Sequence, residues 1–159
     1  MLQVLGMTYN TSETDGEKLF NQNPVFLLKV RAPMYWWLDC GFEKFNLCMP
    51  TKNLEFCLDS FSDCEVLQSY LLKMKYVTRN VKLEPRQLLQ IMPLSTYLEG
   101  TVKLSYQQMV EVCENYACGE YDYRELYNQW PISREWTDFC ETVLDVHGIR
   151  EIIEKEGIL

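Results

Sequence analysis

One stretch decides the fold of this chain: Lys29-Val30-Arg31-Ala32-Pro33-Met34-Tyr35-Trp36-Trp37. A compact apolar run at 25–30 leads into it and has the character of a short strand. Pro33 suits the first turn of a helix, where its missing N–H costs nothing, so we expect a helix over 34–45. The stretch therefore predicts a strand, a turn and a helix that aims two adjacent tryptophans at one place.

Outward from this turn, the sequence predicts a single mixed domain over residues 1–159. Its class is α/β in the broad sense, or more narrowly α+β, with about four to five helices packed on a small sheet. Further strands are expected at 1–7 and 97–104, and further helices from 63, at 84–93, at 106–116 and from 133. We expect an exposed loop over 10–23, or a short helix around 17–20, and a loose C-terminal tail over 149–159.

One of these elements has a predicted buried face, and another has a predicted apolar face. The strand at 97–104 alternates, which places four residues on one side of the sheet: Leu98, Gly100, Val102 and Leu104. The helix from 63 is expected to have a single apolar face: Val66, Leu67, Tyr70, Leu71 and Met74.

The charge of the chain limits the classes of function. Fifteen Lys and Arg residues stand against 23 Asp and Glu residues, for a formal net charge of -8. Gripping nucleic acid requires clustered basic residues, so we expect no direct nucleic-acid contact. An acidic surface suits solubility, or a partner with a basic surface. The sequence has no apolar run as long as the ~20 residues that span a bilayer, and its N-terminus lacks the pattern of a secretory signal. We therefore expect a cytoplasmic protein that does not enter a membrane.

Few residues are candidates for catalysis or metal binding. The seven cysteines form no Cys-x-x-Cys pair, so we expect reduced, mostly buried thiols and no metal site. The single histidine, His147, lies near the expected end of a helix, where interaction with the helix dipole is the commoner role. Motifs for phosphate loops, dinucleotide binding, nucleophile elbows and zinc helices are absent from the sequence. We therefore assign no catalytic residue.

Two aromatic clusters are candidate interfaces. The first, at the start of the 34–45 helix, covers more than one side of it, so part is expected to contact an identical subunit, a ligand or a foreign protein: Tyr35, Trp36 and Trp37. The second lies among acidic residues: Tyr121, Tyr123, Tyr127 and Trp130. Such side chains stack and attract basic groups, which suits an interface; a packed connection between two helices is the alternative.

Three segments in order, 30–37, 92–106 and 134–140, carry a resemblance to a known family. They run Val30-Arg31-Ala32-Pro33-Met34-Tyr35-Trp36-Trp37, then Met92-Pro93-Leu94-Ser95-Thr96-Tyr97-Leu98-Glu99-Gly100-Thr101-Val102-Lys103-Leu104-Ser105-Tyr106, then Arg134-Glu135-Trp136-Thr137-Asp138-Phe139-Cys140. The chain resembles the flavin-dependent thymidylate synthases, and more closely their phage-encoded relatives. The resemblance implies the fold of the thymidylate synthase complementing proteins and a homo-oligomer. In that family, FAD carries a hydride and a folate supplies the carbon that converts dUMP to dTMP.

The family's phosphate-binding signature does not survive in this chain. It is Arg-His-Arg, seven residues and then Ser, placed soon after the Ala-Pro turn. In this sequence the triplet falls on Phe42-Glu43-Lys44 and the serine on Lys52, so within the triplet only Lys44 keeps its charge. An aromatic ring and a carboxylate cannot replace guanidinium groups that bind phosphate through two parallel hydrogen bonds. The resemblance thus implies the scaffold without its chemistry, and no cofactor is expected.

We therefore expect a noncatalytic phage or mobile-element protein that binds a host protein. One concrete form is an inhibitor of a nucleic-acid-binding defence enzyme such as a CRISPR effector, because an acidic face can occupy a basic channel. A second hypothesis is a FAD- and dUMP-dependent enzyme with a rearranged site that relies on Arg31, Lys44 and Lys52 for phosphates. A third is a nucleotide-binding sensor or sequestering protein.

Overall fold

The computed structural model of this chain describes residues 1–48, 54–56, 64–117, 132–146 and 148–157. Within these residues it has one four-stranded sheet and seven helices. The mixed α+β class and the single domain agree with the prediction. The helices outnumber the about four to five expected because α1 and α7, which have seven residues each, also form.

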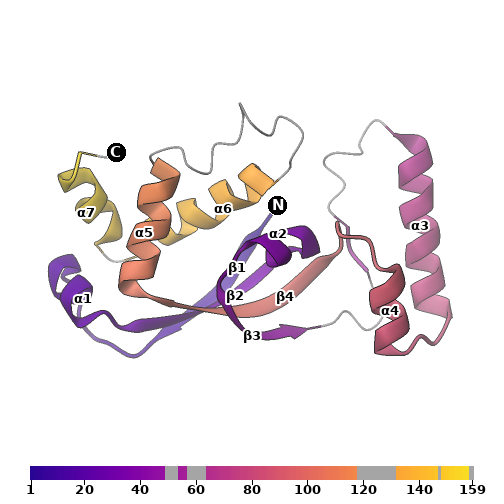
Figure 1. Cartoon of the computed structure of the whole chain (residues 1–159), viewed down its shortest axis with the longest axis horizontal. Coiled ribbons are helices and arrows are strands. Elements are labelled where there is room, and N and C mark those ends of the chain that lie inside the picture. The colour runs from indigo at the N-terminus through magenta and orange to yellow at the C-terminus, as the bar shows by residue number, and fades with distance from the viewer. Residues whose placement is uncertain (49–53, 57–63, 118–131, 147, 158–159) are drawn as a thin grey trace.

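The sheet is antiparallel throughout (Figure 1). Its strands are β1 (Gln3–Tyr9), β2 (Val25–Pro33), β3 (Glu43–Cys48) and β4 (Tyr97–Ser105), in the order β1-β2-β4-β3. The central strands β2 and β4 pair along their whole lengths, from Val25 opposite Ser105 to Pro33 opposite Tyr97. Along β4 every second residue is buried, beginning with Leu98, which confirms the predicted inner face.

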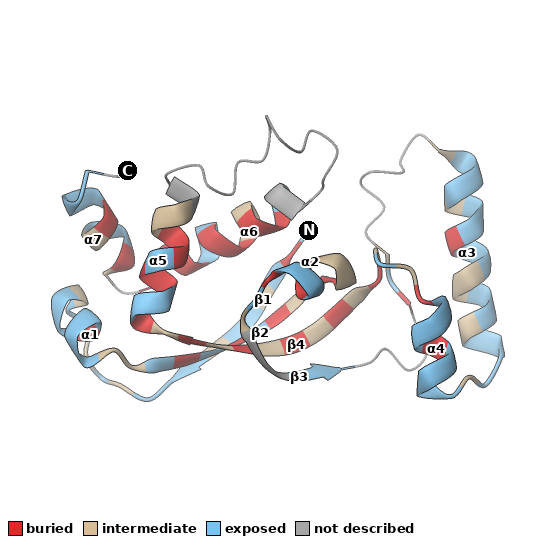
Figure 2. Ribbon diagram, in the orientation of Figure 1, coloured by how far each residue is buried: buried red, intermediate tan, exposed pale blue. Residues whose placement is uncertain are grey.

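Seven helices surround the sheet unevenly. They are α1 (Gly16–Gln22), α2 (Met34–Asp39), α3 (Glu65–Asn80), α4 (Pro85–Ile91), α5 (Tyr106–Ala117), α6 (Ile132–Leu144) and α7 (Ile149–Lys155). Figure 1 shows α5, α6 and α7 together at one end with α1, whereas α3 and α4 stand beyond the other end. Buried residues follow the inner face of the sheet and the sides on which α5, α6 and α7 pack against the sheet or one another, while α3 is mostly exposed (Figure 2).

The strand, turn and helix around Pro33 form as predicted, but the helix is shorter. Pro33 ends β2 in an extended conformation and directly precedes α2. The first two backbone N–H groups of α2, on Met34 and Tyr35, have no partner within the helix and donate instead to the carbonyls of Thr96 and Leu94 at 2.8 and 3.1 Å. This anchors the turn to the segment that leads into β4.

The predicted helix over 34–45 is wrong beyond Asp39. Helix α2 stops there, and Gly41 adopts a positive φ of 64°, a conformation that favours glycine and ends a helix. The chain then reverses into β3, which pairs with β4.

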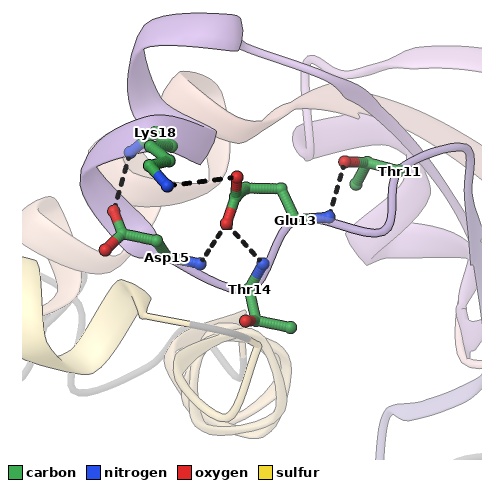
Figure 3. A network of polar contacts seen from close by, with 5 residues as sticks. All are labelled: Thr11, Glu13, Thr14, Asp15 and Lys18. Atoms are coloured by element: carbon green, nitrogen blue, oxygen red, sulfur yellow. Dashed lines mark hydrogen bonds and ion pairs between the residues drawn. The ribbon is translucent and has the colours of Figure 1, made fainter.

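The segment at 10–23 contains a short helix, the second of the two forms that the sequence predicted for it. Asp15 caps α1 by accepting a hydrogen bond from the N–H of Lys18 at 3.0 Å, and Leu19 on this helix is fully buried. Figure 3 shows how the polar residues before the cap serve it: a carboxylate oxygen of Glu13 accepts from the N–H groups of Thr14 and Asp15 at 3.1 and 3.0 Å. The polarity that suggested a loop therefore satisfies the start of a helix.

The C-terminal segment, which the sequence predicted to be a loose tail or a loose terminal helix, forms a helix that packs closely on the core. Helix α7 places Ile149 and Ile153 in the core with no exposed surface. Its Lys155 pairs with Glu17 of α1 at 3.0 Å. The alternation of acidic and apolar residues therefore marks a helix with one face on the core.

Candidate functional site

The two tryptophans of the turn lie inside the chain's own core. Trp36 has no exposed surface, and its ring lies 5.1 Å from that of Trp37 and 5.5 Å from those of Trp136 and Phe139, measured between centroids. The indole N–H of Trp37 donates to the carbonyl of Leu98 at 3.2 Å. These two side chains have no area left with which to meet a partner, so their predicted interface role is corrected to one in packing.

Tyr35, the third residue of that cluster, belongs to a buried polar contact. Its hydroxyl donates to Oε1 of Glu135 on α6 at 2.6 Å. Only 2% of Glu135 is exposed, and its Oε2 has no hydrogen-bond partner among the described residues; neither does the indole N–H of Trp36. Burial raises the pKa of Glu135, and the hydrogen bond from Tyr35 opposes that rise.

Sequence reasoning missed Glu135, although one signal was present. Glu135 stands next to Trp136 and four residues before Phe139, so it shares the apolar stripe of α6. A carboxylate on such a stripe must either be paired or take up a proton. Tyr35 was assigned to an interface, but its hydroxyl provides part of that pairing.

The buried carboxyl makes stability depend on pH, and we expect a Glu135→Gln variant to lose that dependence. The folded pKa of Glu135 lies above its ordinary value of 4.5. The stability contributed by its protonated form is therefore fully present below the unfolded pKa and is lost as the pH rises through the folded pKa. Urea unfolding of wild type and variant across this range should show the wild type losing stability relative to Glu135→Gln as the pH rises.

Tyr35→Phe is the matched control for this experiment. It removes the hydroxyl that stabilises the carboxylate, so the folded pKa of Glu135 should rise further and the loss should extend to higher pH. Parallel pH profiles for wild type and Glu135→Gln would mean that Glu135 titrates as it does in the unfolded chain.

Of the three predicted phosphate ligands, the structure describes the side chain of one. Arg31 on β2 forms an ion pair with Glu55, and its guanidinium lies 4.6 Å from the centre of the Tyr97 ring. Its charge is therefore already engaged by a carboxylate and an aromatic face. Lys44 occupies β3 opposite Val102, with its side chain outside the described residues, and Lys52 lies wholly outside them.

The second aromatic cluster and the single histidine also lie outside the described residues: Tyr121, Tyr123, Tyr127, Trp130 and His147. Their predicted roles stay predictions.

The described cysteines and acidic residues do not form a reactive centre. Three of the five described cysteines are buried: Cys40, Cys113 and Cys140. Burial raises the pKa of Cys113 to about 12 and raises that of Cys140 as well, so neither thiol ionises readily. Across the described part of the chain, no three His, Cys, Asp or Glu side chains gather as a metal site.

Residues 65–91, which comprise α3, α4 and the link between them, are here called the arm. The arm has an unexpectedly apolar surface. Of the apolar residues predicted to share one face of α3, only Leu71 is buried. Large apolar side chains are exposed on several sides of the arm: Val66, Leu67, Tyr70, Leu72, Tyr76, Val77, Leu89 and Ile91. The helix was correctly predicted, but this domain leaves most of its apolar face uncovered.

The arm also differs from the rest of the chain in charge. Residues 65–91 contain five basic and two acidic residues, which leaves ten basic and 21 acidic residues elsewhere. The basic residues of the arm are Lys73, Lys75, Arg79, Lys82 and Arg86. The charge of this chain is thus strongly divided between a basic arm and an acidic remainder.

At the other end of the molecule, α1 and α7 enclose an open hollow of about 290 Å³. Its lining combines apolar and acidic side chains with one base: Glu17, Phe20, Asn21, Ile152, Lys155 and Glu156. Nearby, burial raises the pKa of Glu114, and contact with Glu156 raises it further. The lining of the hollow thus carries two carboxyl groups against one base.

Comparisons with known proteins add no relative to these observations. No model of a known protein family matches the chain, and no curated protein matches it. None of the described helices is both long and apolar enough to cross a membrane.

Proposed function

We propose that this chain is a noncatalytic phage or mobile-element protein that acts in the host cytoplasm by binding a host protein. Its scaffold would be a degenerate flavin-dependent thymidylate synthase-like fold. The observation that carries the noncatalytic part is the state of Arg31. Because Glu55 and Tyr97 already engage its guanidinium, a phosphate would have to displace a carboxylate to reach it.

The distribution of charge supports the binding part. Outside the arm, 21 acidic residues stand against ten basic ones. Such a surface attracts a partner with a basic face and speeds its association. A nucleic-acid-binding defence enzyme has such a face in its nucleic-acid channel, and occupying that channel would inhibit the enzyme.

The experiment has two readouts on the purified full-length chain. Its absorbance spectrum and its thermal unfolding with added FAD or dUMP report on the noncatalytic part: we expect a colourless protein and no change in melting temperature. Capture of proteins from host extract reports on binding. We expect the wild type to capture a host protein, and we expect a double variant with Tyr123→Ala and Trp130→Ala to lose that capture, because these two aromatic residues lie among acidic ones.

Glu55→Gln is the matched variant for the first readout. It removes the charge that pairs with Arg31 and leaves the backbone unchanged. A dUMP-dependent rise in melting temperature in this variant alone would fit a blocked phosphate site. Yellow wild-type protein, or turnover of dUMP by it, would contradict the proposal in favour of an enzyme.

A further inference from the structure

One face of α3 combines exposed apolar and basic side chains. Leu72 and Tyr76 are 67% and 69% exposed. Lys75 and Arg79 fall three and seven residues after Leu72, so that all four lie on one side of the helix. A basic, apolar ridge therefore runs along the arm.

The hollow between α1 and α7 has the complementary composition. Phe20 and Ile152 provide apolar surface, while Glu17 and Glu156 provide acid. The one base in its lining, Lys155, is paired with Glu17 at 3.0 Å, which leaves Glu156 as the excess acid of the lining. The hollow measures about 290 Å³ and is open to solvent, so a protruding side chain of a second copy can enter it.

We propose that two copies of this chain associate antiparallel, with the α3 ridge of each copy seated on the α1–α7 hollow of the other. Helix α3 lies at one end of the long axis of the molecule, and α1 and α7 lie at the other (Figure 1). In the proposed arrangement a two-fold axis relates the copies, so each copy supplies one ridge and one hollow and the pair is closed to further growth. Apolar side chains meet apolar lining, and basic residues meet acidic ones.

The dimer is independent of the proposed host protein, since it uses only described residues of this chain. The test measures the mass of the full-length protein in solution by sedimentation over a range of concentrations. We expect a mass of two chains, with dissociation promoted by high salt, which screens the opposite charges.

Two variants remove one contact surface each. The ridge variant carries Leu72→Glu and Tyr76→Glu, and the hollow variant carries Phe20→Ala and Glu156→Lys. Each alone is expected to sediment as a monomer, with a dissociation constant raised at least tenfold. Leu38→Glu is the control, because Leu38 is also highly exposed but lies on α2, away from both surfaces. It should stay dimeric, and thermal unfolding should show that all variants fold.

Mixing the two variants decides the arrangement. The ridge of the hollow variant and the hollow of the ridge variant are both intact, so an equimolar mixture should recover dimers with one of the two contacts. A hollow variant that stays dimeric would mean that the arms pair with each other, and would overturn the proposal. A monomeric wild type would overturn the proposal too, and the arm would then be available to bind a foreign protein. Capture of a host protein is measured in a separate experiment, so the dimer and the proposed function can fail independently.

Discussion

Replacing Trp36 with alanine is expected to lower the free energy of unfolding by about 3–5 kcal/mol, the range for removing a large buried aromatic side chain. Trp36 is fully buried and in ring contact with Trp37, Trp136 and Phe139. Its loss would leave a cavity at the junction of α2 and α6, which surrounding rings fill only in part. Urea unfolding followed by circular dichroism measures the change.

Leu38→Ala on the same helix is the control. Leu38 is 69% exposed, so its truncation should change the stability by no more than about 0.5 kcal/mol. An unfolding free energy that barely changes in Trp36→Ala, together with a change in oligomeric mass, would restore Trp36 to an interface.

Gly100→Ala is expected to have the second large effect, a loss of about 2–3 kcal/mol, because overfilling a tightly packed site strains it. Gly100 lies on the inner face of β4, where an added Cβ would come within 2.7 Å of Leu47 Cδ2 and 2.8 Å of both the carbonyl oxygen of Asn46 and Trp37 Cη2. One of these neighbours is backbone, so it cannot simply rotate away. Equilibrium unfolding in urea measures the loss.

Gly6→Ala is the control for the added methyl group. Gly6 lies on the edge strand β1, and nothing stands within 4 Å of its Cβ position. We expect it to be neutral or slightly stabilising, by up to about 1 kcal/mol, through the reduced freedom of the unfolded chain. Combining Gly100→Ala with Trp37→Phe should recover part of the loss; strictly additive losses would show that Trp37 is not the obstacle.

Local patterns predicted the elements of this fold better than their environments. The alternation in 97–104 identified β4 and its inner face, because a period of two depends only on neighbouring residues. The same reasoning placed Trp36 and Trp37 at an interface, since it counted aromatic residues around one helix. Trp36 is covered by Trp136 and Phe139, about a hundred residues away, and Trp37 donates a hydrogen bond to Leu98 of β4, which no local pattern reveals.

The arm shows a second limit of local patterns. Its apolar residues were predicted to share one face of a helix, and such faces usually pack on their own domain. In this chain only Leu71 of that set is buried, Met74 is half-buried and the other three are exposed. The buried Glu135 was missed for a related reason: its importance comes from Tyr35, which is distant in sequence and close only after folding.

The order β1-β2-β4-β3 has a consequence for the chain as it leaves the ribosome. Strand β2 can pair with β1 as soon as residue 33 has emerged, but its other edge waits for β4, which ends at Ser105. The ring of Trp36 gains its full cover only when Phe139 of α6 has been synthesised. For most of translation this nascent chain therefore presents an open strand edge and an incompletely covered tryptophan, features that chaperones bind and that promote aggregation.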